Sequence, residues 1–378
     1  MAREYRVVST DDHITEPPGI FDGRLPSKFA DRTPKAIEDE EGSAWILDGQ
    51  PVRMSGLANA AGEKVEEFSP KGKTYKDMRP GVYDPKERLL DMDLDGVDAQ
   101  VCFPTLPGGA NGTLIELADK EYAAALTSAY NDWLVEEWCA PDPERLLGLG
   151  ILPLWDLNAS AAEVRRIAEL GLKGVTLPSA PASYPGVLPF TDPGWDPVWE
   201  ALSETGLPAE IHIATGKKDL GVLNPGVGSP AAVFVHLAPA SNMTVVSTLL
   251  FSDILIRYPN LRFVSAESGI GWLPYFLERA DYTFRKHRFW TGVSSGTPPS
   301  ELFRQSILVN YISDKAGVEL RHMIGIDNIM IGTDYPHTDT SWPDTQRVIK
   351  EQMGDIPDDE RHKICAGNAV RIFHLDAV

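Results

Sequence analysis

Cysteine is scarce in this chain, and its three copies are widely separated. Cys102, Cys139 and Cys365 form no Cys-x-x-Cys pair, so neither a cysteine zinc site nor a disulfide framework can be read from their spacing. Cys102 lies in an apolar, strand-like run and is interpreted as a small buried hydrophobic residue. This cysteine usage fits a reducing cytoplasm.

Long hydrophobic runs are also missing. The first ten residues contain no apolar signal core. The most apolar stretches, such as residues 231–240, are far shorter than the roughly 20 residues that a membrane helix needs. We therefore expect a cytoplasmic protein with no membrane partner.

Basic residues are few relative to acidic ones. The 35 Lys and Arg residues against 55 Asp and Glu residues give a formal net charge of -20. A nucleic-acid backbone and an anionic membrane surface both require clusters of Lys and Arg. Nucleic-acid binding and peripheral membrane binding are therefore not expected.

The order of the apolar runs predicts the fold. Eight short strand-like runs alternate with helical segments, at residues 6–10, 97–103, 146–152, 172–177, 209–213, 261–266, 306–310 and 328–332. This alternation predicts a (β/α)₈ barrel, an α/β fold that forms one domain over residues 1–378. An open doubly wound sheet is the alternative, but no glycine-rich phosphate turn follows the first strand.

Residues 35–81 interrupt the alternation after the first strand. Trp45-Ile46-Leu47, Asp48-Gly49 and Pro51-Val52 predict a small hairpin, and residues 71–80 are polar and loop-like. We interpret residues 35–81 as an inserted cap or lid. Two loops rich in Pro and Gly, 179–189 and 220–230, are long enough to shape the mouth of a pocket.

Polar residues gather where the strands are expected to end. The C-terminal strand ends of a barrel meet on one face, where its active site lies. The candidates at these ends are Asp11, Asp12, His13, His212, Glu267, Asp334 and His337. Asp11 and His13 are two positions apart in an extended segment, so their side chains are expected to point the same way.

This residue set suits metal chemistry. Imidazole and carboxylate ligands together fit zinc, manganese or iron(II) with an open position for water, which a neighbouring carboxylate can deprotonate. Each residue also has an ordinary interpretation: His212 as a core histidine, Asp334 as a helix N-cap, and Asp11 or Asp12 as part of an Asx turn. The coincidence of three strands with polar residues at the same end favours the metal site.

Several motifs resemble the amidohydrolase-related family, whose members include aminocarboxymuconate semialdehyde decarboxylase and aromatic-acid decarboxylases. The resemblance spans nearly the whole chain. It is carried by residues 11–17 (DDHITEP), 83–85 with 96–99 and 103–105, 267–269 with 272–274 and 279–281, 332–337 with 341–343, and 367–369 with 371–373.

The resemblance implies a distorted TIM barrel with C-terminal helices and one divalent metal, Zn²⁺ in the first place, with Mn²⁺ or Fe²⁺ as alternatives. It assigns Asp11, His13, His212 and Asp334 as metal ligands, and Asp334 also as a proton shuttle. Asp11 replaces the more usual His or Glu of the family. The resemblance also implies a homodimer or a larger homo-oligomer.

Glu267 stands where decarboxylases of this family often carry an acid/base histidine. Three roles stay open for its carboxyl group: an acid/base with a pKa raised by burial, a further metal ligand, or an acceptor for helix-start amides. His337 is expected to orient the substrate or to contact a ligand, with the holding of the Asp-Tyr-Pro turn as its alternative role.

Candidates for substrate binding lie further from the strand ends. The tryptophans could form an apolar wall, with packing as the alternative; they are Trp272, Trp290 and Trp342. His236 is a candidate for facing the pocket, with a core or interface position as the alternative. Three basic residues of the insertion could clamp a substrate carboxylate, with a solvated face as the alternative; they are Arg53, Lys73 and Arg79.

Three functions are compatible with these residues. The leading hypothesis is a mononuclear metal hydrolase that attacks a carbonyl of a small cyclic or aromatic substrate, with Asp334 as proton shuttle and Glu267 protonating the leaving group. The second is a nonoxidative decarboxylase of an aromatic or unsaturated carboxylic acid, in which Asp334 protonates the ring carbon. The third is a catalytically inactive ligand-binding barrel, for which Glu267 in place of histidine is the only hint.

Overall fold

The strands of the molecule form a barrel. The computed structural model describes residues 3–108, 110–216 and 228–375, and within them one sheet holds eight parallel strands in the order β1-β5-β6-β7-β8-β9-β10-β11. The strands are β1 Val8–His13, β5 Ala99–Phe103, β6 Leu146–Gly150, β7 Gly174–Pro178, β8 Ala209–His212, β9 Phe263–Ala266, β10 Ile307–Tyr311 and β11 Ile329–Ile331. Backbone hydrogen bonds from Asp334 N to Asp11 O (2.7 Å) and from His13 N to Tyr335 O (2.6 Å) join the two edges. The predicted (β/α)₈ architecture is confirmed.

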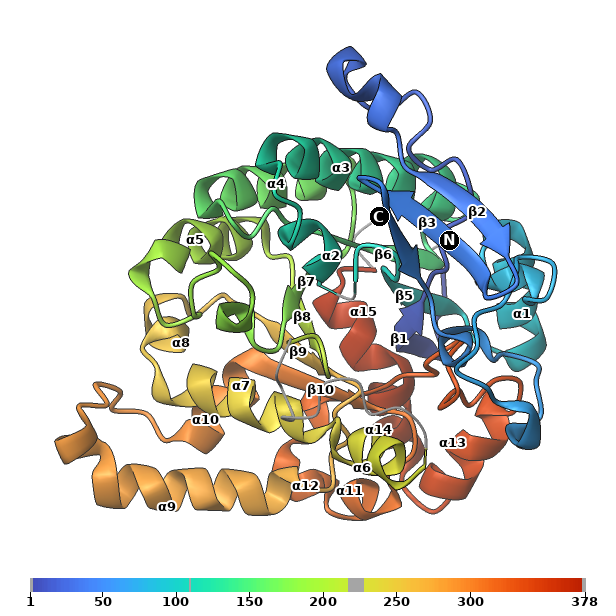
Figure 1. Ribbon diagram of the computed structural model, residues 1–378. Coiled ribbons are helices and arrows are strands. Elements are labelled where there is room, and N and C mark those ends of the chain that lie inside the picture. The colour runs from blue at the N-terminus through green and yellow to red at the C-terminus, as the bar shows by residue number, and fades with distance from the viewer. Residues whose placement is uncertain (1–2, 109, 217–227, 376–378) are drawn as a thin grey trace.

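Helices surround the strands (Figure 1). They are α1 Pro85–Asp95, α2 Gly112–Ile115, α3 Lys120–Trp133, α4 Leu157–Leu170, α5 Asp196–Thr205, α6 Ser229–Leu237, α7 Ala240–Phe251, α8 Ile254–Arg257, α9 Leu273–Thr291, α10 Pro299–Ser306, α11 Lys315–Glu319, α12 Arg321–Ile324, α13 Thr345–Met353, α14 Asp358–His362 and α15 Asn368–Ile372. Local sequence sets the ends of two of these helices. Asp84 accepts hydrogen bonds from the Lys86 and Glu87 amides ahead of Pro85, and Gly171 ends α4 in the left-handed conformation.

The interior of the barrel is filled by apolar side chains. Val101, Leu149, Val264 and Leu308 belong to a buried cluster that also contains Phe373, directly after α15. Tyr5 and Val8, near the start of β1, lie in the same cluster. The C-terminal helix therefore packs against the end of the barrel opposite to the strand ends that carry the polar candidates.

Strand β1 begins two residues later and ends three residues later than the predicted run 6–10, and this changes the position of three candidate residues. Asp11, Asp12 and His13 lie inside the strand rather than after it. Ser9 pairs with Gln100 but Asp12 pairs with Cys102, so β1 contains one extra residue at this point, which is a β-bulge. The sequence pattern missed the extension because charged residues rarely occupy a fully buried strand.

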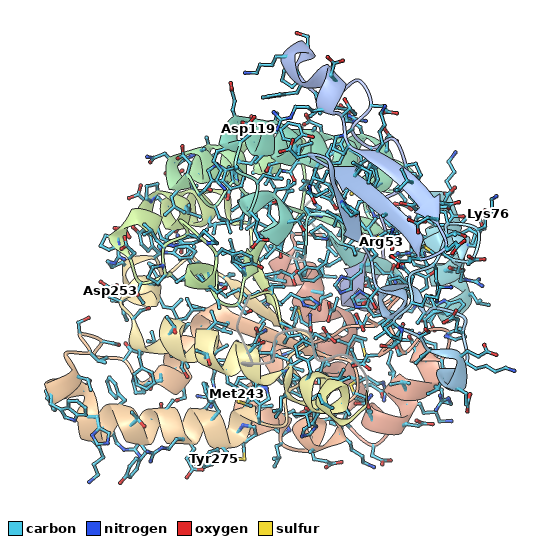
Figure 2. The ribbon with its side chains drawn as sticks, in the orientation of Figure 1. Arg53, Lys76, Asp119, Met243, Asp253 and Tyr275 are labelled. Atoms are coloured by element: carbon cyan, nitrogen blue, oxygen red, sulfur yellow. The ribbon has the colours of Figure 1, made fainter. Side chains whose placement is uncertain are left out.

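The insertion after β1 contains a small antiparallel sheet of β2 Lys35–Asp39, β3 Gly42–Leu47 and β4 Gln50–Arg53. The predicted hairpin is β3–β4, while β2 was not predicted. Arg53 lies on this sheet (Figure 2). Backbone hydrogen bonds fix the insertion to the loop after β11: the Ala60 and Ala61 amides donate to Pro336 O, at 2.8 and 3.1 Å. The role of the insertion as a cap or lid stays a prediction.

Helices α6 and α7 form an apolar stretch that is longer than the sequence analysis allowed. Pro230–Phe251 comprises 22 residues and suits a membrane span by length and composition alone. In this fold, however, α7 packs on the barrel: Asn242 donates hydrogen bonds to Ile211 O (2.9 Å) and Ala266 O (3.2 Å). Residues 220–227 of the expected pocket-mouth loop lie outside the described part of the chain.

Candidate active site

Six predicted site residues meet at the C-terminal ends of the strands. They come from β1, from the last residue of β8, from the position after β9 and from the loop after β11. Their ligand atoms form three overlapping groups, each within 4.8 Å: Asp11–His13–His212, His13–Asp334–His337 and Asp11–Glu267–Asp334. The structure therefore contains the predicted cluster of metal-binding residue types.

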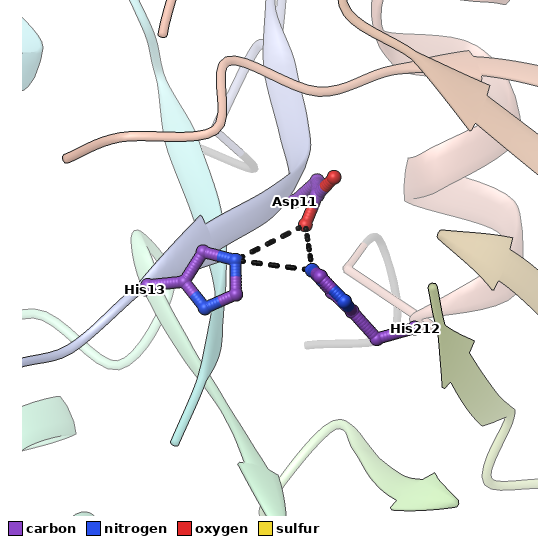
Figure 3. A group of neighbouring side chains, drawn as sticks. All are labelled: Asp11, His13 and His212. Carbon is purple, nitrogen blue, oxygen red and sulfur yellow. Dashed lines mark hydrogen bonds and ion pairs between the residues drawn. The ribbon is translucent and has the colours of Figure 1, made fainter. Parts of the chain in front are cut away.

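The spacing of the donor atoms fits a shared ion. Asp11 Oδ1 lies 3.6 Å from His13 Nε2 and 3.5 Å from His212 Nε2, and the two Nε2 atoms are 3.2 Å apart (Figure 3). Asp334 Oδ1 lies 3.4 Å from His13 Nε2. Two ligands each roughly 2.1 Å from one ion, at angles between about 90° and 109°, are about 3.0–3.4 Å apart. The observed separations are close to this range.

Burial strengthens the case for a cation. Asp11 and Asp334 are completely buried, and none of their four carboxylate oxygens accepts a hydrogen bond from the described residues. Buried carboxylates without donors are costly unless a proton or a metal ion neutralises them. Two orphaned carboxylates beside two imidazoles are a donor set that suits a divalent metal.

The same environment shifts the pKa values of the cluster. Burial, and next the charge of Asp11, raises the pKa of the Asp334 carboxyl group well above its usual range. Burial, and next the charge of Asp334, does the same for the pKa of the Glu267 carboxyl group. Burial also favours the neutral form of His212, but the neighbouring Asp11 carboxylate outweighs it and raises the pKa of His212 to about 10. Without a cation, protons must therefore neutralise part of the cluster.

The backbone aims two of the carboxylates inward. Glu267 and Asp334 have φ values of 55° and 51°, in the left-handed region that residues other than glycine rarely adopt. The Glu267 amide donates to Asn310 Oδ1 at 2.7 Å, and the Asp334 amide is held by Asp11 O. Such conformations are typical of functional sites, where surrounding contacts maintain them.

His337 lies against the cluster from the loop after β11. Its Nδ1 atom is 2.8 Å from Asp334 Oδ1, and its ring stacks on the His13 ring with centroids 3.8 Å apart. Burial lowers the pKa of His337 to about 4. The ring also lines the cavity beside the cluster, so it can exchange a proton with Asp334 or contact a bound molecule.

Asp12 holds the two halves of the site together. Its Oδ1 atom accepts hydrogen bonds from Gln100 Nε2 (3.1 Å), from the Thr333 hydroxyl and from the Tyr335 amide (3.2 Å). Thr333 and Tyr335 flank Asp334, while Asp12 lies between Asp11 and His13. The side chain of Asp12 therefore fixes the first-strand candidates relative to the last-strand candidate.

Arg88 of α1 is a buried positioning residue that sequence reasoning missed. It is completely buried and donates to His13 O (2.6 Å), Gly81 O (2.6 Å) and Gln100 Oε1 (3.1 Å). Its guanidinium thus supports the backbone of His13 and the partner of Asp12. The available signal was the spacing of charged residues at 88, 91 and 95, which form the buried face of α1 with Met92.

A cavity of about 670 Å³ opens beside the cluster. Its described lining is Ser55, Leu57, Ala58, His212, Ile213, Ala214, Phe234, Val235, Ala238, Pro239, Glu267, Gly269, Ile312, Ser313, Asp334, His337, Thr338 and Asp339. The walls are mostly apolar, with serine and threonine hydroxyls near the site. The insertion contributes three of these residues. A second cavity of about 610 Å³, which includes Lys120 and Trp155, contains none of the site candidates.

The four predicted substrate-binding residues do not line the described cavity. Trp272 donates its indole N–H to Ser268 O (2.9 Å), and Trp342 donates to Asp91 O (3.0 Å). Arg79 forms an ion pair with Asp91 (2.5 Å) and lies over the Trp342 ring. His236 is exposed on α6, whereas its neighbours Phe234 and Val235 face the cavity.

The other basic and aromatic candidates are also away from the cluster. Arg53 pairs with Asp39 (2.5 Å) and Glu41 (3.2 Å). Lys73 pairs with Glu63 (2.7 Å). Trp290 is 76% exposed near the end of α9. Sequence reasoning instead missed Leu57, Phe234 and Ile312, which do line the cavity.

Comparison with known proteins gives a consistent family. The amidohydrolase family model matches residues 25–375. The chain is 25% identical over 311 residues to 2-amino-3-carboxymuconate-6-semialdehyde decarboxylase of Dictyostelium discoideum, covering 81% of this chain and 80% of the relative. It is 25% identical over 327 residues to gamma-resorcylate decarboxylase of Rhodococcus jostii, covering 79% and 92%. It is 30% identical over 316 residues to 2-keto-4-carboxy-3-hexenedioate hydratase of a Sphingobium strain, covering 77% and 81%.

Solved structures share the fold. An amidohydrolase from Mycobacterium avium subsp. paratuberculosis has a TM-score of 0.76 at 22% identity, with 98% of this chain and 100% of that chain covered. A 5-carboxyvanillate decarboxylase from Novosphingobium aromaticivorans, complexed with manganese and 4-hydroxy-3-methoxy-5-nitrobenzoic acid, has a TM-score of 0.70 at 21% identity, with 98% and 96% covered. At these identities the likeness concerns the fold.

Proposed function

The chain belongs to the amidohydrolase family, and from this premise we propose that it is a metal-dependent nonoxidative decarboxylase of an aromatic or unsaturated carboxylic acid. The two orphaned, fully buried carboxylates of Asp11 and Asp334 beside two imidazoles are the observation that carries the metal dependence. The decarboxylases among the relatives support the reaction. The relatives therefore favour decarboxylation over hydrolysis, which the sequence alone had placed first.

The proposed ion is held by Asp11, His13, His212 and Asp334. When bound, it supplies a Lewis acid that anchors the substrate carboxylate and a neighbouring oxygen. The cavity suits the rest of such a substrate. Leu57, Phe234 and Ile312 offer an apolar wall for a ring, and its volume of about 670 Å³ is that of a small-molecule site.

Asp334 is the proposed proton donor. Its carboxyl group can carry a proton received from His337, whose ring lies against it. Asp334 donates this proton to the carbon that bears the substrate carboxylate. The carbon–carbon bond then breaks, its electron pair restores the ring or the double bond, and carbon dioxide leaves. His337, with Nδ1 2.8 Å from Asp334 Oδ1, returns a solvent proton to Asp334 for the next turnover.

Hydration is the second candidate function. The relative with 30% identity is named as a hydratase of an unsaturated carboxylic acid. The same residues suit this chemistry, because Asp334 can donate or accept the proton when water adds across a double bond. Decarboxylation and hydration differ in the fate of the carboxyl carbon, which an experiment can follow.

A substrate panel tests the proposal. The protein is loaded with Mn²⁺ and incubated with ring-hydroxylated benzoates and unsaturated dicarboxylates, while carbon dioxide and the organic product are quantified. The proposal predicts stoichiometric carbon dioxide and decarboxylated product, both lost after chelation. Turnover of lactones or cyclic amides without carbon dioxide would instead restore hydrolysis as the function.

A further inference from the structure

We propose that Glu267 is a fifth protein ligand of the metal, so that the donor set holds three carboxylates and two imidazoles and its preference is shifted from zinc toward manganese or iron(II). The inference rests on the metal site of the proposed function but not on the reaction. The sequence left three roles open for Glu267: acid/base, metal ligand, or acceptor for helix-start amides. The inference selects the second of these roles.

The position of Glu267 matches that of the other donors. Its Oε2 atom lies 3.3 Å from His212 Nε2, a separation within the 3.2–3.6 Å found among Asp11, His13 and His212. Its carboxylate also lies within 4.8 Å of ligand atoms of both Asp11 and Asp334. Glu267 thus approaches the cluster from the end of β9.

The acceptor role is filled by another residue. The amides that precede α9, those of Ile270 and Gly271, donate to Asp314 Oδ2 at 2.7 and 2.6 Å. Asp314 also accepts the Gly317 amide at the start of α11 (2.8 Å). The Glu267 carboxylate is therefore not needed at the start of α9, and its left-handed backbone turns it toward the cluster.

Charge explains why a third carboxylate is tolerated there. Asp11, Glu267 and Asp334 bring three carboxylates into one buried or nearly buried group, and like charges at such distances repel strongly when nothing neutralises them. A divalent cation bound by these carboxylates would offset most of this repulsion. Carboxylate oxygens are hard donors that suit manganese, whereas sets richer in nitrogen or sulfur suit zinc. A third carboxylate therefore shifts the preference of the site toward the harder ion.

Metal binding tests this assignment without any substrate. Apparent dissociation constants for Mn²⁺ and for Zn²⁺ are measured by chelator competition on the wild-type protein and on Glu267→Gln and Glu267→Ala. Asp339→Asn is the matched control, because Asp339 lines the same cavity but belongs to none of the three ligand groups. Circular dichroism of the metal-free variants verifies that each is folded, and the Mn²⁺ EPR spectrum reports a change of ligand directly.

Both Glu267 variants should bind Mn²⁺ at least about tenfold more weakly, since even outer partners of metal ligands contribute about 10–100-fold. The loss should be smaller for Zn²⁺, the EPR spectrum should change, and Asp339→Asn should stay within twofold of wild type. Folded variants with wild-type Mn²⁺ affinity and an unchanged spectrum would overturn the assignment, whatever their activity. A wild-type protein that binds neither ion would contradict the proposed function itself.

Discussion

The Nε2 atoms of His13 and His212 face each other at 3.2 Å, although 199 positions separate the two residues in the chain. Two ring nitrogens at this distance need either a proton or a metal ion between them. Asp11 Oδ1 lies 3.5–3.6 Å from both, which places a negative charge beside the same point. The barrel thus brings β1 and β8 together around a position that suits a cation.

Metal affinity should rise with pH. His212 binds a metal only as the neutral ring, and the pKa of about 10 that Asp11 imposes against burial keeps the ring protonated at neutral pH. The ion must displace that proton, so each unit of lower pH should weaken binding about tenfold per proton released. Calorimetry in two buffers with different ionisation enthalpies measures the proton count. An affinity independent of pH, with no proton released, would be inconsistent with His212 as a ligand.

Replacement of Asp334 by Asn should remove catalysis without unfolding the protein. The amide cannot donate the proton that the reaction requires, and kcat should fall by roughly 10³-fold or more. The backbone hydrogen bond from the Asp334 amide to Asp11 O is independent of the side chain. Carbon dioxide release and circular dichroism are the two measurements. A folded variant that keeps full activity would show that another residue donates the proton.

The hydrogen bond from Thr333 to Asp12, which joins the two halves of the site, can be tested with Thr333→Val. This variant removes the hydroxyl that donates to the buried Asp12 carboxyl group, which should lower the free energy of unfolding by about 1–3 kcal/mol. It should also weaken metal binding, because Thr333 directly precedes the proposed ligand Asp334 and its hydrogen bond to Asp12 helps to hold that residue in place.

Thr345→Val is the matched control for the loss of the hydrogen bond from Thr333 to Asp12. The Thr345 hydroxyl donates to the buried Asp95 carboxylate at 2.6 Å, away from the cluster. A similar loss of stability with unchanged metal affinity is expected. Equal metal affinity in both variants would mean that the Asp12–Thr333 bond supports the fold only.

Arg79→Ala should affect stability rather than substrate binding. Arg79 pairs with the buried Asp91 and is itself 37% exposed, so solvent screening limits the expected loss to about 1 kcal/mol. Because Arg79 does not line the described cavity, KM should not change. Arg53→Ala, at a more peripheral ion pair, is the control for a surface charge. A large rise in KM for Arg79→Ala alone would place Arg79 in the substrate site after all.

The barrel and its cluster were predictable because their signals are local and repeated. Apolar runs mark the buried strands, and the strand ends then place Asp11, His13, His212 and Asp334 on one face. The cavity walls were not predictable, because they depend on which face of each surrounding element turns inward. In the run 233–237, the polarity of His236 indicates a pocket residue, but the helix directs Phe234 and Val235 to the cavity instead. On α1, Leu90 and Leu94 are exposed and Arg88 is buried, the reverse of what their polarity alone would suggest.

Loss of carbon dioxide in a metal-dependent reaction is tested most directly by mass spectrometry of the product formed in D₂O. The Mn²⁺-loaded protein acts on a substrate labelled with ¹³C in its carboxyl group. If the protein is a decarboxylase, the label leaves as carbon dioxide and one deuterium occupies the vacated carbon, with no product after chelation or in Asp334→Asn. A product that retains the labelled carbon and gains the mass of one water would contradict decarboxylation and establish hydration or hydrolysis instead.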